Sequence, residues 1–147
     1  MFKIVRFPGR YFSELAARWL RDNEGAGTFF AMLPEKEIHI VNLKADVEYQ
    51  ELLSAEAQTN GMRSGLVRLE PGQSCGQHST EAHEEMLVFL TGGGQIIIGN
   101  DGLYEMTENQ VAYIPPRTLH DVKNTGQKPL AYIYCVAPVK RTSARRQ

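Results

Sequence analysis

Residues 72–92 read GQSCGQHSTEAHEEMLVFLTG, and residues 114–124 read IPPRTLHDVKN. Short apolar runs bounded by glycine and proline predict strands joined by tight turns. Side chains two residues apart on a strand share a face, so His83 and Glu85 point the same way, and a hairpin brings them opposite His78. His120 follows on a third strand. The spacing predicts a metal site inside a small β-barrel.

The kinds of side chain narrow the choice of metal. Two imidazoles and a carboxylate with open positions form the facial triad associated with non-haem Fe(II), and the same set suits Mn(II) or Ni(II). Zinc also accepts it, although structural zinc usually recruits cysteine. We expect a divalent transition metal (Fe, Mn, Ni or Zn) held by His78, Glu85 and His120. The alternative is a metal-poor pocket in which Glu85 and His120 form hydrogen bonds only.

The chain from Met62 onward has the pattern of an all-β domain, with short apolar runs separated by turn residues about every ten positions. The expected strands are 64–69, 75–80, 85–90, 95–98, 111–114, 120–122 and 130–136. Residues 86–90 are apolar without alternation, so we expect both faces of that strand to be covered, by the N-terminal segment or by another subunit. Gly92-Gly93-Gly94 is expected to be a hairpin turn.

The first sixty residues are less regular. The spacing predicts a helix over Tyr11–Asp22 and short strands at 28–33 and 38–43. Residues 44–57 are ambiguous, since they contain helix formers but a thin apolar stripe. We expect residues 1–60 to be an extension packed on the barrel, residues 61–138 to be the barrel, and residues 139–147 to be a basic, disordered tail.

Composition excludes several classes of function. The 147 residues suit one domain, and the formal net charge of −1 gives no general attraction to nucleic acid or to acidic membranes. No apolar run approaches the length of a membrane span, and no signal peptide is recognised, so we expect a cytoplasmic protein. The two cysteines are expected to be buried free thiols. Regular alternation places Cys75 on the face opposite His78, and a thiolate near the metal is the alternative, since Cys75 is only three residues before His78.

The stretches 72–92 and 114–124 resemble the two motifs of the cupin superfamily, G(X)5HXH(X)3-4E(X)6G and G(X)5PXG(X)2H(X)3N. Gly72, His78, Glu85 and Gly92 match the first motif, and Pro115, His120 and Asn124 match the second. The resemblance covers residues 62–138. It implies an all-β, jelly-roll antiparallel barrel that binds a metal through His78, Glu85 and His120. Dimerisation is common among such barrels, so a homodimer is expected.

Three positions depart from the cupin motifs. Thr80 replaces the second histidine of HXH, Arg117 replaces the glycine of PXG, and Asn109 replaces the glycine that opens the second motif. If Arg117 has a positive φ, that conformation costs on the order of 1 kcal/mol, whereas asparagine tolerates it better. His83 is a candidate for the missing ligand, and a position in the hairpin loop is the alternative.

Candidate substrate-binding residues are Arg117, Tyr113 and Tyr134, whose side chains can form hydrogen bonds to a small-molecule ligand. A solvated arginine and structural tyrosines are the alternatives. The site favours an enzyme of oxygenase, isomerase or related lyase type that acts on a small oxygen-bearing metabolite. Thr80 favours the alternative of a non-catalytic small-molecule or metal-binding module. No catalytic acid or base is identified.

Overall fold

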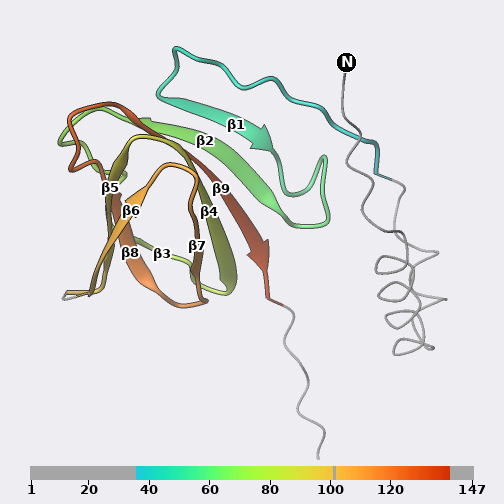
Figure 1. Ribbon diagram of the computed structural model, residues 1–147. Coiled ribbons are helices and arrows are strands. Elements are labelled where there is room, and N and C mark those ends of the chain that lie inside the picture. The colour runs from blue at the N-terminus through green and yellow to red at the C-terminus, as the bar shows by residue number, and fades with distance from the viewer. Residues whose placement is uncertain (1–35, 101, 140–147) are drawn as a thin grey trace, which may run out of the picture. The chain divides into compact units, whose positions relative to one another are not determined.

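The computed structural model describes residues 36–100 and 102–139, and these form nine antiparallel strands in two facing sheets (Figure 1). The strands are β1 (Tyr49–Leu53), β2 (Arg63–Leu69), β3 (His78–Ser79), β4 (His83–Thr91), β5 (Gly93–Ile98), β6 (Gly102–Thr107), β7 (Val111–Ile114), β8 (Leu119–Lys123) and β9 (Leu130–Pro138). One sheet has the order β1-β2-β9-β4-β7 and the other β3-β8-β5-β6. Within this part of the chain, no helix has the length and apolar character to cross a bilayer.

The core lies between the two sheets, where alternate side chains of each strand meet. In β4, Leu87 and Phe89 are both 1% exposed, and they pack with Ile96 of β5, Val122 of β8 and Leu130 of β9. Glu85 continues the same inward row and is also buried. The alternation that builds the core therefore carries a carboxylate into the interior.

The structure changes or resolves the sequence prediction for three segments, 38–43, 44–57 and 92–94. The segment 38–43 is extended but pairs with no described strand, and Ile38 and Ile40 are about nine-tenths exposed. The ambiguous segment 44–57 contains β1, which adds an edge strand to the larger sheet. Residues 92–94 are not a hairpin turn, because β4 and β5 belong to different sheets and the chain turns a corner there. The predicted helix over 11–22, the strand at 28–33 and the tail from residue 140 lie outside the described residues.

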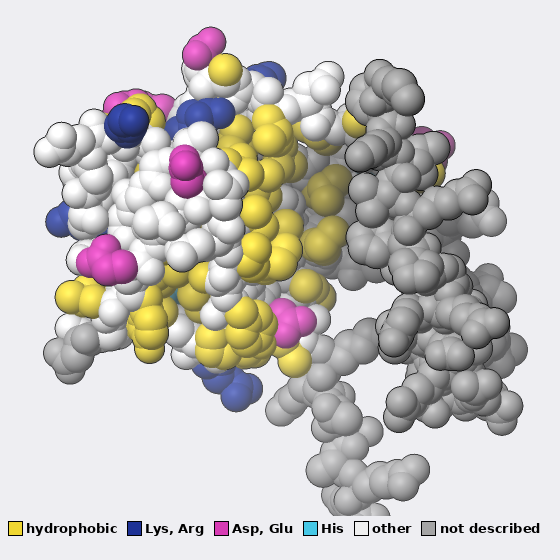
Figure 2. Space-filling view, viewed as in Figure 1, with side chains coloured by type: hydrophobic (Ala, Val, Ile, Leu, Met, Phe, Trp, Pro, Cys, Tyr) yellow, Lys and Arg dark blue, Asp and Glu magenta, His cyan; other side chains and the backbone are white. Residues whose placement is uncertain are grey.

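The outer face of the larger sheet is apolar around β4 and β7. Cross-strand partners Met86 and Tyr113 are 41% and 61% exposed, and Val111 is 64% exposed. Figure 2 shows hydrophobic side chains gathered in a band on this side of the molecule. Within one chain the second face of β4 is thus only partly covered, so a single chain does not test the expected cover by another subunit. A homodimer that covers this face stays a prediction.

Arg117 and Asn109, which replace the two motif glycines, both have the left-handed backbone conformation that glycine adopts freely. Arg117 has φ 58° and Asn109 has φ 64°. Replacing Arg117 by glycine is therefore expected to raise the free energy of unfolding by up to about 1 kcal/mol, less the entropy that glycine adds to the unfolded chain. Urea denaturation measures the change. Asn109→Gly is the matched control and should gain less, because asparagine already tolerates this conformation. A loss of stability in Arg117→Gly would contradict the strain argument.

Candidate metal centre

Three groups that can bind a metal converge from both sheets. His78 on β3 and His120 on β8 are direct cross-strand partners in the smaller sheet, and their ring centroids lie 4.3 Å apart. Glu85 reaches them from β4 in the larger sheet. Potential ligand atoms of these three residues all lie within 4.8 Å of one another. Two imidazoles and one carboxylate thus meet, with Glu85 and His120 buried and His78 exposed.

The separations fit a shared ion. Nε2 of His120 lies 3.1 Å from Oε2 of Glu85. Two ligand atoms each about 2.1 Å from one ion, and at right angles, would lie about 3.0 Å apart. In a facial set every pair of ligand atoms would lie about 3.0 Å apart, so groups separated by up to 4.8 Å would move toward one another when an ion binds.

The nitrogen of His120 that faces Glu85 has no hydrogen bond in this structure. His120 is 0% exposed, and its Nε2 is a buried atom without a hydrogen-bond partner. The 3.1 Å separation from Glu85 satisfies an ion-pair distance, but the N–H direction does not satisfy a hydrogen bond. Hydrogen bonds weaken steeply with misalignment, so this contact is electrostatic and is not a hydrogen bond. A buried orphan nitrogen is costly, and a metal ion would satisfy it.

Both histidines are oriented in the same way. Nδ1 of His78 lies 2.8 Å from the carbonyl of Gly76, and Nδ1 of His120 lies 3.3 Å from the carbonyl of Thr118. In each case the carbonyl belongs to the residue two positions earlier. When Nδ1 carries the proton and donates to that carbonyl, Nε2 is left with a free lone pair. This is the outer support that metal-binding histidines usually have.

Opposing effects act on the pKa of His120, which is buried beside Glu85. Burial lowers the pKa of His120, but the Glu85 carboxylate and the Thr118 carbonyl outweigh it, so the pKa is raised overall. Glu85 is only 6% exposed, and among the described residues its only ion-pair partner is His120. A buried carboxylate needs a cation, and here either an imidazolium or a metal ion can supply that charge.

The triad opens into a cavity of about 390 Å³ between the sheets. One part of its wall is apolar, formed by Val67, Leu87, Val122 and Val136. The polar part also includes Arg63, Ser79, Thr80, Glu81, His83 and two tyrosines, Tyr132 and Tyr134. Such a mixed cavity suits a small metabolite with a few polar groups.

Comparison with known proteins agrees with this architecture. The family model described as "Cupin domain" matches residues 65–136. The chain belongs to the cupin superfamily. A predicted oxalate decarboxylase from Thermotoga maritima has a similar structure (TM-score 0.58, 27% identity, 62% of this chain and 79% of that one). An RmlC-like cupin family protein from Methanocaldococcus jannaschii, with a double-stranded β-helix fold, gives a TM-score of 0.59 at 17% identity, over 69% of this chain and 93% of that one.

A curated relative is an uncharacterised protein of Methanocaldococcus jannaschii, 33% identical over 61 residues. The match covers 42% of this chain and 48% of the relative, so the chain spans about half the length of that protein.

The fold class is confirmed as an all-β, antiparallel cupin jelly roll.

The missing second histidine of this cupin is replaced by a structural threonine. Thr80 is 6% exposed, and its hydroxyl donates to the carbonyl of Pro115 at 2.8 Å and accepts from the amide of Thr118 at 3.0 Å. Thr80 therefore fixes the loop that leads into β8 and His120. Because both hydrogen bonds go to the backbone, the side chain holds the loop at a position where the cupin motif has a ligand.

His83 lies in the same cavity but outside the convergent triad. It is half-buried, begins β4 and lines the cavity with His78 and Glu85. The group whose ligand atoms lie within 4.8 Å of one another contains His78, Glu85 and His120 but not His83. Its service as a fourth ligand remains a hypothesis, which metal analysis of His83→Ala would test.

Cys75 does not lie on the face opposite His78, so that prediction is wrong. The thiol lines the same cavity, because Gly76 has φ 89° and interrupts the regular alternation between the two residues. Sγ accepts a hydrogen bond from the amide of Val122 at 3.3 Å and donates to Oδ1 of Asp121 at 3.2 Å. Burial raises the pKa of Cys75 to about 11. The thiol is thus neutral at physiological pH and a poor metal ligand in that form.

Of the three candidate substrate-binding residues, one lines the cavity of the triad and two do not. Tyr134 lines the cavity of the triad, but its hydroxyl lies 2.9 Å from that of Tyr49. Tyr113 is exposed on β7 and donates to Oε2 of Glu84 at 3.2 Å. Arg117 is exposed and is not among the residues that line this cavity.

Sequence reasoning missed Arg63. It is the first residue of β2 and lies on the same face as Gly65 and Val67. The alternation of that run was the available signal, but the predicted strand began one residue later.

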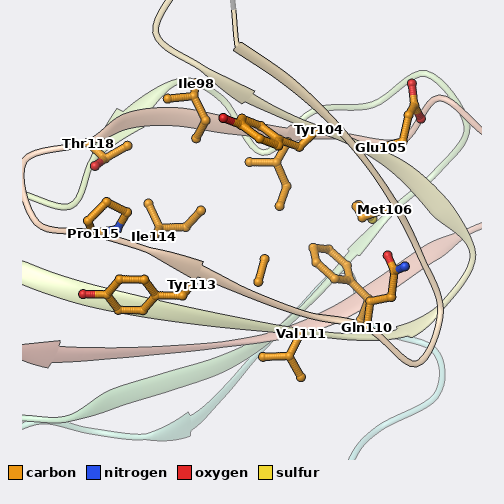
Figure 3. A pocket seen from close by; sticks show the side chains of 13 residues that line it. Ile98, Tyr104, Glu105, Met106, Gln110, Val111, Tyr113, Ile114, Pro115 and Thr118 are labelled. Carbon is orange, nitrogen blue, oxygen red and sulfur yellow. The ribbon is translucent and has the colours of Figure 1, made fainter.

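A second cavity, of about 650 Å³, lies between β7 and the β5–β6 hairpin. Figure 3 shows Tyr104 on one side of it and Tyr113 on the other. Its floor includes Phe89, Ile96 and Ile114, and no histidine or cysteine lines it. Although it is larger, we assign the chemistry to the smaller cavity, because that cavity contains the triad and the orphan nitrogen of His120.

Proposed function

We propose that this cupin is an enzyme that uses one divalent transition metal (Fe, Mn, Ni or Zn), held by His78, Glu85 and His120, to act on a small oxygen-bearing metabolite. Oxygenase, isomerase and related lyase reactions are the classes considered. The observation that carries the proposal is the buried Nε2 of His120, which lacks a hydrogen bond and lies 3.1 Å from Glu85. Both histidines also have Nδ1 beside a backbone carbonyl, which leaves Nε2 for the ion.

Each part of the cavity has a role in this proposal. When bound, the ion would polarise a substrate oxygen as a Lewis acid or, if redox-active, support oxygen chemistry. Glu85 would lower the net charge at the centre. The apolar wall of Val67, Leu87 and Val136 excludes bulk water from the substrate. Cys75 and Tyr132 lie in the same cavity as neutral groups.

The comparison with the Thermotoga maritima protein supports a lyase reaction among the three classes. That protein is described as a predicted oxalate decarboxylase and is 27% identical to this chain over the matched region. Decarboxylation of a small acid is one reaction that a metal centre with open positions can support.

The second candidate function is a non-catalytic module that binds a small molecule or a metal. One observation favours it: Thr80 stands at the position of the second cupin histidine and supplies two structural hydrogen bonds. A site with one ligand fewer binds its metal less tightly, so this observation favours ligand binding without catalysis.

Metal analysis and activity assays separate the two candidates. The purified chain should contain about one transition-metal ion, measured by elemental analysis. Oxygen uptake and product formation should then be followed with a panel of small diols, thiols and keto acids. Turnover that depends on the metal supports the enzyme. A metal-free protein that binds the same compounds without turnover supports the module.

Chelation should also destabilise the fold. The three ligands come from both sheets, so the ion would connect β3 and β8 to β4. A ligand that binds only the folded state adds about 2.7 kcal/mol at one hundred times its Kd. We expect the Tm of the metal-loaded protein to fall by about 5 °C or more after treatment with a chelator, measured by circular dichroism. The chelator should not change the Tm of Glu85→Gln to the same extent, and an equal change would contradict the assignment.

A further inference from the structure

We infer that Arg63 binds a carboxylate of the substrate, so the proposed metal centre acts on a small organic acid. This inference rests on the proposed function and names its substrate class. Arg63 lines the same cavity as His78, Glu85 and His120. Within residues 36–100 and 102–139, no side chain forms an ion pair or hydrogen bond with its guanidinium. Arg63 is exposed at the start of β2, and its planar donor group is unused by the described side chains.

The charge of the cavity favours an anion. Its ionised lining groups are Arg63, Glu81 and Glu85, when the histidines are neutral. A divalent ion would bring the total to one positive unit, whereas without Arg63 the total would be zero. A single anionic group on the substrate therefore neutralises the loaded cavity. Arg63 determines whether that attraction exists.

The neighbours of Arg63 leave its guanidinium available. Arg63 pairs across the sheet with Val136, and the next inward pair is Gly65 with Tyr134. A Cβ on Gly65 would come within 2.6 Å of the Tyr134 ring, so glycine allows that ring to lie flat on β2. The ring then places its hydroxyl 2.9 Å from that of Tyr49, on the edge strand. Tyr134 is thereby engaged with Tyr49.

The cavity also limits the size and form of the acid. Its volume of about 390 Å³ suits a compound of a few carbon atoms rather than a polymer end. A guanidinium binds a carboxylate through two parallel hydrogen bonds. The apolar wall of Val67, Leu87 and Val136 fits a short hydrocarbon segment. A small keto or hydroxy acid has this arrangement, with its carboxylate at Arg63 and an oxygen near the triad.

The test compares an acid with its neutral amide. The metal-loaded protein is titrated with 2-oxobutanoate, 3-hydroxybutanoate and the amide of each, by isothermal titration calorimetry. We expect at least one acid to bind more tightly than its amide. Arg63→Gln should weaken that acid by about 10- to 100-fold, as expected for a charge-assisted hydrogen bond, and leave amide binding within twofold. Arg63→Lys should fall between the two, because it keeps the charge but loses the fork.

Arg117→Gln is the matched control, since Arg117 is exposed like Arg63 and carries the same charge but does not line the cavity. It should bind the acid as the unmodified protein does. Acid binding that survives Arg63→Gln, that is lost in Arg117→Gln, or that never exceeds amide binding would overturn the inference. So would failure of the loaded protein to bind either acid at millimolar concentration. Elemental analysis of each sample separates these results from failure of the metal site, which would leave the unmodified chain without metal.

Discussion

Replacing His120 by alanine is expected to remove the transition metal from the purified protein. His120 is fully buried, and its Nε2 has no hydrogen bond to another group. Loss of an outer support for a metal ligand typically costs 10- to 100-fold in affinity, and loss of the ligand itself should cost more than about 100-fold. Elemental analysis after dialysis should therefore find less than about one-tenth of the metal bound by the unmodified chain.

The control for this prediction uses another histidine of the same cavity. His83→Ala removes an imidazole that lines the cavity but lies outside the convergent triad. It should keep most of its metal, whereas His78→Ala should lose it. Circular dichroism checks that each variant is folded. A folded His120→Ala protein with its full metal content would contradict the proposed centre, and loss of metal in His83→Ala would make His83 a fourth ligand.

The rule that side chains two residues apart share a face was most informative for Glu85. It placed this carboxylate on the face of His83, and in the structure Glu85 is buried in the same row as Leu87 and Phe89. The same rule failed for Cys75, because the left-handed backbone of Gly76 interrupts the strand. A single glycine in a short run cannot be distinguished from a regular strand residue without the structure.

Two of the four edge strands, β1 and β6, were not predicted, for a related reason. β1 and β6 lie at the edges of their sheets, where each has only one neighbour. In β6, the adjacent residues Leu103 and Tyr104 are both 61% exposed, so hydrophobicity does not alternate along the strand. Sequence periodicity reports burial, and an edge strand that is exposed on both faces gives little of that signal.

The spacing of the three proposed ligands in the sequence does not by itself explain why they lie close together. His78 and His120 are adjacent because β3 pairs with β8, and Glu85 joins them from the other sheet. Strand spacing predicted that the residues share an interior, but the sheet order sets their separation. The cupin resemblance supplied that order in advance, since its two motifs come from barrels in which these positions meet. Arg63 belongs to neither motif, and only the structure placed it in the cavity.

The corner between β4 and β5 gives the prediction with the largest expected effect on stability. Gly94 is buried on β5, and a Cβ at that position would lie 2.1 Å from the backbone oxygen of Lys123 on β8. The obstacle is backbone, so no side-chain rotation relieves it. The following residue, Asn124, is also fixed, because its Nδ2 donates to the carbonyls of Leu69 and Lys128 at 2.8 and 2.9 Å. The two strands would have to separate.

Gly94→Ala is therefore expected to lower the free energy of unfolding by more than about 3 kcal/mol, at or beyond the upper end of the usual cost of overpacking. Urea denaturation measures the change, and failure to obtain soluble protein would agree with it. Gly93→Ala is the matched control: its Cβ would lie 3.2 Å from the carbonyl of Met106, a contact that a small shift relieves, and we expect a loss of about 1 kcal/mol. Equal losses in the two variants would mean that added bulk anywhere at this corner is damaging. A Gly94→Ala protein as stable as the unmodified chain would show that β5 and β8 are not as close as described.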